Sequence, residues 1–271
     1  MKLTIVTPSF NQAEFLEKTI RSVVEQGYDD LEYLVLDGGS TDGSADILER
    51  FDEQITWWTS EPDDGQTPAI NRGIGMATGD VVAYINSDDY FLPGAFATAM
   101  GLFEKTNARW VIGASRVEDF NGVVEHVWTP ELPTKPRHWW LIDPWGYPQP
   151  SSFWHRDVFE EFGRFREDMH FIFDTEFGVR LLLGGVEPVL TDEVLAVRVD
   201  HPAAKSQDPA PFKREQKAFY KLHGAKLTPS ERARMEVWRR FIGSRGHRAV
   251  DAASRRAPWR AARDRRLAAR S

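Results

Sequence analysis

Short apolar runs alternate with stretches of helical periodicity over the first hundred residues. After Asn11, which can cap a helix, the apolar residues Leu16, Ile20, Val23 and Val24 recur at helical spacing up to Gly27. The pattern predicts strands at 3–6, 33–36, 56–59 and 81–85, and further helices at 45–51 and 69–77. Strands that alternate with helices in this way indicate an α/β fold with a mostly parallel sheet and helices on both faces.

The second half of the chain has a different pattern. Asn121-Gly122 lies between two strand-like runs and predicts a hairpin. Residues 128–150 hold six prolines and four tryptophans, which predicts a long irregular loop. A helix is expected at 173–183 and a late strand at 194–199, and the sequence TPSE at 228–231 has the form of a helix capping box.

Composition and charge narrow the class of protein. The 271 residues include no cysteine, which excludes disulfides, thiolate metal sites and a cysteine nucleophile. Neither a signal peptide nor an apolar run of about 18 residues is found. We therefore expect a cytoplasmic protein, with peripheral contact to the inner face of the membrane as an open alternative.

The charges are unevenly distributed. Residues 232–271 carry thirteen Arg, no Lys and three acids, a net charge of +10, so that a total of −7 leaves −17 for the rest. An acidic body argues against nucleic acid as the main ligand, because phosphate backbones need a basic surface. In the tail, Trp238, Phe241 and Ile242 form an apolar stripe beside arginines. Such a helix can lie on an anionic bilayer or pack on the acidic body, and both alternatives stay open.

Acidic residues follow two of the predicted strands. Asp37 ends one strand, and Asp88 and Asp89 come after another in the sequence VVAYINSDDY. Ligands of such sheets bind at the carboxyl ends of the strands. Asp37 can bind a nucleoside or cap its turn together with Ser40; the pair at 88 and 89 can cap a turn or bind Mg²⁺ or Mn²⁺ through hard oxygen ligands.

Three ordered segments resemble a known family. They are TIVTPSFNQAEFLEKTIRSVVEQGYDDLEYLVLDGGSTDGS, GQTPAINRGIGMATGDVVAYINSDDYFLPGA and FDTEFGVRLL. Together they resemble family 2 glycosyltransferases with the GT-A fold, over about residues 1–205. The resemblance implies a GT-A-type Rossmann-like mixed sheet, a nucleotide-diphosphate sugar donor, a divalent cation (Mn²⁺ or Mg²⁺) and inversion at the anomeric carbon. It also implies a glycan or lipid-linked acceptor in the synthesis of cell-surface polysaccharide or glycoconjugates.

The same resemblance implies a donor and metal site. The family's aspartate-x-aspartate motif falls on Asn86-Ser87-Asp88, with Asn in place of the first Asp. It implies Asp88, Asp89 and His201 as metal residues. Its expected donor-binding residues are Thr7, Pro8, Ser9, Asp37, Asp64, Gln66, Asn71, Asn86, Ser87 and Lys205. Many relatives have two consecutive acids where this chain has Asp37-Gly38, so a uridine donor cannot be assumed.

Inverting transfer needs a base that removes the proton of the acceptor hydroxyl. The segment FIFDTEFGVRL resembles the base-bearing helix of the family, which implies Asp174 as the base. Glu176 lies two residues on and faces another direction. It can support catalysis together with Arg180, or simply form an ion pair with Arg180 at i+4.

The acceptor side is expected in the second half. Gln149 and Ser151 are candidates for sugar hydroxyls, and Trp139, Trp140 and Trp145 can stack on sugar rings or form a core under the loop. We divide the chain into a nucleotide-sugar-binding half (1–110), an acceptor-binding and catalytic half (111–205) and a helical Arg-rich extension (206–271). Two rival functions are a nucleotidyltransferase on a related fold and a non-enzymatic nucleotide-sugar or glycan-binding protein.

Overall fold

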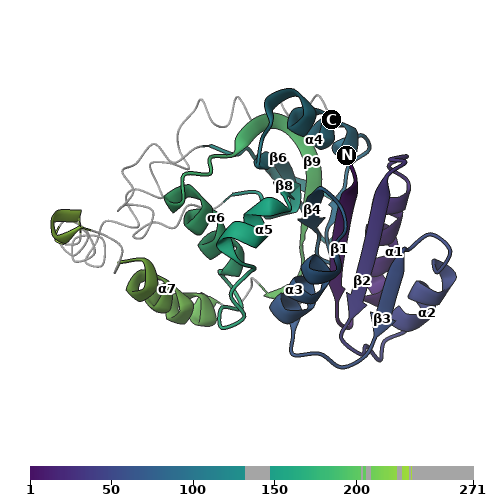
Figure 1. The fold of residues 1–271 in the computed structure, drawn as a ribbon. Helices are drawn as coiled ribbons and strands as arrows, with labels where there is room; N and C mark the ends of the chain where they lie inside the picture. Colours follow the sequence, from purple (N-terminus) through teal and green to yellow (C-terminus); the bar gives the residue numbers. More distant parts are fainter. Residues whose placement is uncertain (132–146, 203, 206–208, 225–227, 232, 234–271) are drawn as a thin grey trace.

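The computed structural model describes residues 1–131, 147–202, 204–205, 209–224, 228–231 and 233. Within them, one nine-stranded sheet is surrounded by helices (Figure 1). The strands are β1 Leu3–Ser9, β2 Leu31–Asp37, β3 Trp57–Ser60, β4 Val81–Tyr84, β5 Tyr90–Phe91, β6 Trp110–Asp119, β7 Val124–Trp128, β8 Ser152–His155 and β9 Val189–Asp200. The helices are α1 Ala13–Val24, α2 Ser44–Arg50, α3 Gln66–Met76, α4 Ala95–Thr106, α5 Asp157–Phe162, α6 Phe173–Leu183 and α7 Pro209–Gly224, with a 3-10 turn at Gln149–Ser151.

The order of the strands joins the two halves of the chain. The sheet runs β3-β2-β1-β4-β8-β6-β9-β5, and β7 pairs with β6. From β3 to β4 all pairings are parallel, whereas β8 is antiparallel to both β4 and β6. Because β1, β2 and β4 point the same way, their carboxyl ends lie at one edge of the sheet, where we look for the site.

Two hydrophobic clusters cover the two faces of the sheet. Side chains of a strand alternate between faces. In β4, Val82 and Tyr84 accordingly pack in the cluster with α3, α5 and α6, while Val81 and Ala83 pack in the cluster with α1, α2 and α4. Figure 1 shows α3 and α1 on opposite sides of the N-terminal strands. The expected arrangement of helices on both faces is present.

The start of α1 differs from the expectation. The N-cap is Gln12, without a side-chain hydrogen bond, and Asn11 has a left-handed φ of 52°. The Asn11 side chain instead accepts a hydrogen bond from the N–H of Thr41, and Asp42 accepts one from the N–H of Ala13 at 2.8 Å. The prediction that Asn11 caps this helix is wrong, because a carboxylate from the loop after β2 takes the role.

Two local predictions in the second half are confirmed. The turn between β6 and β7 contains Asn121 and Gly122, and Asp119 accepts hydrogen bonds from the N–H groups of Asn121 and Val123. At 228–231, Glu231 accepts from the N–H of Thr228, and the Thr228 hydroxyl accepts from the N–H of Glu231. This reciprocal pair is a capping box.

Some predictions fall outside the described residues. Trp139, Trp140 and Trp145 lie there, as do nearly all residues of the basic tail. In the part of the chain that the structure describes, no helix is both long and apolar enough to cross a bilayer.

Candidate active site

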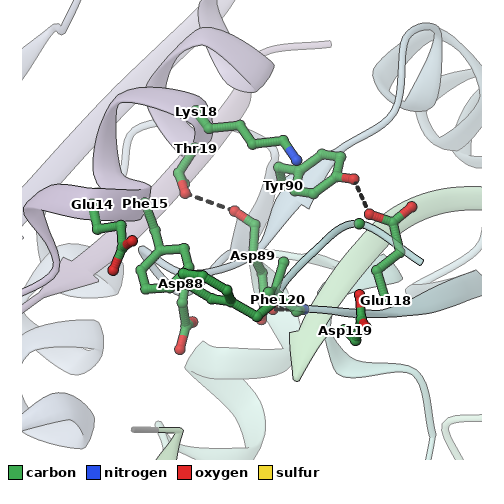
Figure 2. A pocket seen from close by; sticks show the side chains of 12 residues that line it. Glu14, Phe15, Lys18, Thr19, Asp88, Asp89, Tyr90, Glu118, Asp119 and Phe120 are labelled. Carbon is green, nitrogen blue, oxygen red and sulfur yellow. Dashed lines mark hydrogen bonds between the residues drawn. The ribbon is translucent and has the colours of Figure 1, made fainter. Parts of the chain in front are cut away.

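The loop between β4 and β5 carries the acidic pair and is fixed to α1. The buried Thr19 hydroxyl donates a hydrogen bond shared between the carbonyl oxygens of Ser87 and Asp89, at 2.8 and 2.7 Å. Figure 2 shows the bond to Asp89. The Asn86 amide donates to the Asp89 carboxylate at 3.3 Å. These contacts hold the loop in one conformation at the carboxyl end of β4.

The two adjacent acids have different surroundings. The Asp89 side chain is buried and accepts a hydrogen bond from the N–H of Val199 in β9 at 3.0 Å. Burial and the neighbouring charge of Asp88 raise the pKa of Asp89 well above its usual value. Asp88, whose side chain is 21% exposed, faces the Nε2 atom of His201 across 3.1 Å. Asp89 therefore attaches β9 to the loop, and Asp88 and His201 meet as a consequence.

His201 is held by aromatic neighbours. It is buried, and its ring lies 4.6 Å from the ring of Phe15 in α1, centroid to centroid. Phe15 in turn contacts Phe120, at the tip of the hairpin, edge-on at 6.0 Å. A pocket beside the acids is lined by Phe15, Asp88, Phe120 and Glu118, among others (Figure 2).

Asp88 and His201 fit a divalent cation. A carboxylate oxygen and an imidazole nitrogen are suitable ligands for Mn²⁺, and Mg²⁺ commonly takes one or two carboxylates and completes its shell with water and substrate phosphates. Among the described residues, no cluster of three or more His, Cys, Asp and Glu could hold a metal ion. The pair thus fits a site that a bound diphosphate would complete.

The expected donor-binding residues of β1 differ in whether a ligand could bind their polar atoms. The Thr7 hydroxyl is buried against the hydroxyl of Tyr33 at 3.1 Å, so it lies within the protein. Pro8 is buried in the pairing of β1 with β2. The hydroxyl oxygen of Ser9 is buried without a hydrogen-bond partner in the described structure, at the end of β1. Of these three, Ser9 alone has an unpaired polar atom that a ligand could use.

Asp37 is part of a turn. Its carboxylate accepts hydrogen bonds from the N–H and hydroxyl of Ser40, at 2.9 and 2.5 Å, and from the hydroxyl of Ser60 at 2.7 Å. With only 1% of its surface exposed, it orders the loop after β2, as the turn-capping alternative expected. A direct contact with a nucleoside would need the surrounding loop to open, because the carboxylate is buried.

A chain of side chains links the two halves of the site. The Gln66 amide donates to Asn86 Oδ1 at 2.7 Å, and Lys205 donates from Nζ to Gln66 Oε1 at 2.9 Å. The start of α3, the end of β4 and the segment after β9 therefore meet here. Asp64, also expected at the donor, is exposed in the turn before α3.

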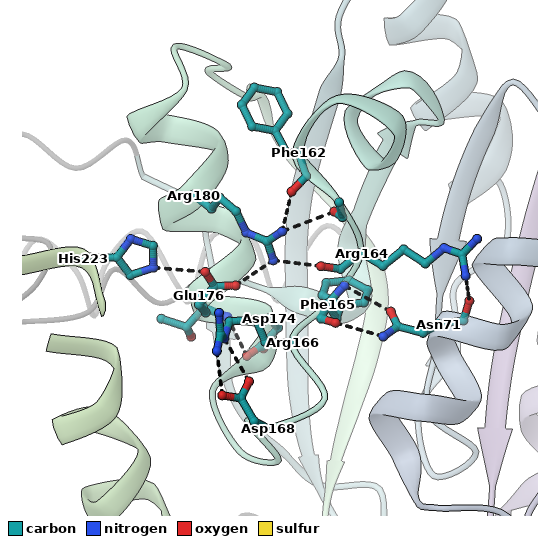
Figure 3. Close-up of polar contacts among 12 residues, drawn as sticks. Asn71, Phe162, Arg164, Phe165, Arg166, Asp168, Asp174, Glu176, Arg180 and His223 are labelled. Atoms are coloured by element: carbon teal, nitrogen blue, oxygen red, sulfur yellow. Dashed lines mark hydrogen bonds and ion pairs between the residues drawn. The ribbon is translucent and has the colours of Figure 1, made fainter. Parts of the chain in front are cut away.

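Asn71 and Ser87 are buried, and their hydrogen bonds remain within the protein. The Asn71 amide donates to Phe165 O and to Glu167, and its oxygen accepts the N–H of Phe165 (Figure 3). Asn71 thereby fastens the loop before α6 to α3. Ser87 contributes its carbonyl oxygen to Thr19.

Asp174 is the second residue of α6. Burial raises the pKa of its carboxyl group above the usual value, while the N–H of Thr175 and the charge of Lys205 oppose the rise. The carbonyl oxygen of the same residue accepts a hydrogen bond from the Tyr147 hydroxyl at 2.8 Å. A carboxylate with a raised pKa is a stronger base, which suits proton abstraction.

Glu176 forms a buried ion-pair network on another side of α6. Its carboxylate lies 2.7 Å from Nη2 of Arg180 and 3.0 Å from Nε2 of His223 in α7 (Figure 3). Arg180 also donates to the carbonyl oxygens of Phe162 and Arg164. Although burial would raise the pKa of Glu176, His223 and Arg180 lower it below its usual value. The ion-pair alternative for Glu176 therefore describes the geometry, and the described hydrogen bonds and ion pairs of Arg180 do not include Asp174.

Gln149 and Ser151 are not accessible to an acceptor. Gln149 donates to the carbonyl oxygen of Tyr84 at 3.0 Å, and the Ser151 hydroxyl lies 2.7 Å from both Ala114 O and Ser115 Oγ. Both residues are buried, and Ser151 is fully so. The structure corrects the expectation that their side chains face a sugar; they join the turn before β8 to the sheet.

Sequence reasoning missed two residues of this region. The sequence analysis singled out neither Phe15, whose ring packs on His201, nor His223, which lies beside Glu176. Both are separated from their partners by more than forty residues in sequence, so no local pattern could have paired them.

Comparison with known sequences identifies a family. The family model described as "Glycosyl transferase family 2" matches residues 4–163 of this chain. An uncharacterised glycosyltransferase of Nostoc is 31% identical over 124 residues, which are 45% of this chain and 38% of that protein. The GalNAc(5)-diNAcBac-PP-undecaprenol beta-1,3-glucosyltransferase of Campylobacter jejuni is 33% identical over 103 residues, 36% of this chain and 33% of that protein. The matches thus span about a third of the length of these two relatives.

Solved structures share the fold. Residues 1–349 of Staphylococcus aureus TarS, in complex with UDP-GlcNAc, superpose with a TM-score of 0.67 and 17% identity, over 90% of this chain and 73% of the other. The mannosyltransferase PcManGT of Pyrobaculum calidifontis, in complex with GDP-Man and Mn²⁺, gives 0.55 and 17%, over 92% of this chain and 82% of the other. At these identities the likeness concerns the fold, and the expected GT-A-type mixed sheet is confirmed.

Proposed function

Because the chain belongs to glycosyl transferase family 2, we propose that it moves a sugar from a nucleotide-diphosphate donor to an acceptor hydroxyl with inversion. One observation carries the proposal: the segment after β9 reaches both parts of the site. His201 meets Asp88, and four residues later Lys205 bonds to Gln66 and lies close enough to Asp174 to lower its pKa. These contacts support the proposal that a cation site, a basic group and the general base form one site at the carboxyl edge of the sheet.

Each residue has a role in the proposed reaction. Asp88 and His201 would hold Mn²⁺ or Mg²⁺, which balances the charge of a diphosphate leaving group. Lys205 places a cation beside the same group. Asp174 accepts the proton of the acceptor hydroxyl as its oxygen attacks the anomeric carbon from the side opposite the diphosphate. The raised pKa of Asp174 supports this role.

The donor can be identified with the full chain. The experiment measures the melting temperature with a panel of nucleotide sugars, each with and without Mn²⁺, and then measures release of the nucleoside diphosphate. A donor raises the melting temperature in proportion to RT ln(1 + [L]/Kd). We expect a rise in melting temperature that depends on Mn²⁺. We also expect slow release of the nucleoside diphosphate when an acceptor is present. Binding without release under any acceptor would favour the rival, a non-enzymatic binding protein.

We further propose a lipid-linked acceptor and a cytoplasmic enzyme that contacts the membrane peripherally. The support is the name of the Campylobacter relative, which acts on an undecaprenol diphosphate, and the Arg-rich tail. Each Arg near an anionic surface adds about 1 kcal/mol of attraction.

Co-sedimentation of the full chain with vesicles that contain anionic lipid tests this contact. We expect binding that salt weakens and that Arg239→Glu with Arg240→Glu reduces. Binding only to neutral vesicles, or none, would refute it.

A further inference from the structure

Helix α7 lies beyond the part of the chain that matches the family, yet it contacts the helix that carries Asp174. The Glu215 carboxylate accepts hydrogen bonds from three consecutive backbone N–H groups just before α6. These are His170 at 2.8 Å, Phe171 at 2.7 Å and Ile172 at 3.2 Å. Hydrogen bonds to an ionised acceptor are about twice as strong as neutral ones.

These three groups belong to the N-cap of α6 and the two residues before it. The N-cap of α6 is Ile172, which provides no side-chain hydrogen bond, and the helix starts at Phe173. Backbone donors at a helix start have no partner within the helix and must find one elsewhere. Asp174 comes two residues after the last N–H that Glu215 binds. The direction of the Asp174 carboxylate thus depends on a loop whose conformation Glu215 fixes.

A second contact holds α7 to α6 further along. His223, two turns after Glu215, lies 3.0 Å from Glu176, and both side chains are almost fully buried. Between them in sequence, Phe219 is fully buried in the hydrophobic cluster that contains Phe173 and Phe177 of α6. α7 therefore contacts α6 at three points. Glu215 binds the residues just before α6, His223 lies beside Glu176 in its first turn, and Phe219 packs in the apolar cluster that includes Phe173 and Phe177.

We propose that Glu215 is a positioning residue for Asp174, which acts by holding residues 170–172 so that the base faces the anomeric carbon. The proposal depends on the proposed function, because it requires Asp174 to be the base. A misplacement of about 1 Å at a reacting group can lower a rate about a hundredfold. Donor binding is expected to change much less than kcat, because none of the expected donor residues lies at 170–172. Glu215 acts on only one of them, Lys205, through its charge.

The experiment compares Glu215→Ala and Glu215→Gln with the wild-type full chain. Glu215→Ala removes all acceptor oxygens, and we expect kcat to fall about ten- to a hundredfold while KM and Kd for the donor remain within about twofold. Glu215→Gln keeps one acceptor oxygen and should recover part of the rate. Hydrogen exchange should become faster at 170–175 in Glu215→Ala and remain unchanged in β1 and β4.

Two control variants separate positioning from stability. Lys217→Gln changes the charge of an exposed residue of the same helix and should leave kcat unchanged. Leu48→Ala creates a cavity in the other hydrophobic cluster and should lower the melting temperature without lowering kcat below that temperature.

Several results would overturn the proposal. They are a wild-type kcat in Glu215→Ala, a loss of donor affinity that accounts for the whole effect, or an equal loss of kcat in Leu48→Ala. Absence of transfer in the wild-type chain would overturn the proposed function, and the positioning role with it; normal transfer by Glu215→Ala overturns the positioning role alone.

Discussion

At the scale of single residues, the acids at 88 and 89 differ in what their oxygens contact. Asp89 binds the N–H of Val199 inside the protein, and Asp88 faces His201 at the edge of the pocket. The sequence predicted an acidic pair that could bind a cation, and the family resemblance implied Asp88 as the second acid of the motif. It could not show what Asp89 contacts, because adjacent residues in a loop have no fixed orientation. The pairing of β5 with β9 provides that information.

We predict different effects for the two acids. Asp88→Ala should abolish the Mn²⁺-dependent rise in melting temperature caused by the donor, because a ligand of the cation is lost. Asp89→Ala should retain more of that rise but lower the melting temperature of the free protein, because leaving the Val199 N–H unpaired costs about 1–3 kcal/mol. Thermal melting of both variants with and without donor measures this. An unchanged donor response in Asp88→Ala would contradict the metal assignment.

Lys205 should set the acidic limit of activity. Its charge lowers the pKa of Asp174, which burial raises, so Lys205→Gln should raise that pKa further. The base works only when ionised, so kcat at saturating donor should fall at a higher pH in the variant than in the wild type. The pH profile of kcat measures this, with Lys217→Gln as the control. An acidic limb that stays in place or moves to lower pH would refute the electrostatic link.

At the scale of elements, hydrophobic periodicity predicted the positions of the helices well. It did not predict which helices pack against one another. The pattern at 173–183 corresponds to α6, residue for residue, because its apolar face is buried along its whole length. It could not show that α7 packs on α6, because Glu215 and His223 are ordinary polar residues in sequence. The two-residue strand β5 could not be predicted either, because so short a strand shows no alternation of polar and apolar residues.

The buried carboxylate of Glu176, which lies between Arg180 and His223, should make stability depend on pH. The pKa of Glu176 is lowered in the folded state, so its contribution is present above the unfolded pKa and is lost as the pH falls through the folded value. Glu176→Gln should destabilise the protein near neutral pH by about 3 kcal/mol, the scale of breaking a buried pair.

Melting curves of the wild type and Glu176→Gln across pH measure this. The difference between them should shrink toward acid. A constant difference at all pH values would show that the charge of Glu176 contributes nothing.

At the scale of the whole molecule, the sheet brings together residues that are far apart in sequence. Asp88, Asp174 and His201 come from a loop after β4, from α6 and from the end of β9. The family resemblance singles out these three because it depends on ordered motifs, and their roles stay predictions. It did not anticipate the buried positions of Gln149 and Ser151, because burial depends on how β8 fits between β4 and β6.

The most direct test of the account is the turnover of Asp174→Asn at saturating donor and Mn²⁺, relative to wild type. Asn has nearly the same shape but cannot accept the proton, so we predict a loss of about a hundredfold or more, the scale of general-base catalysis. The donor-dependent rise in melting temperature should be retained, which shows that the site still forms. Turnover close to wild type in Asp174→Asn would contradict the claim that this residue is the base.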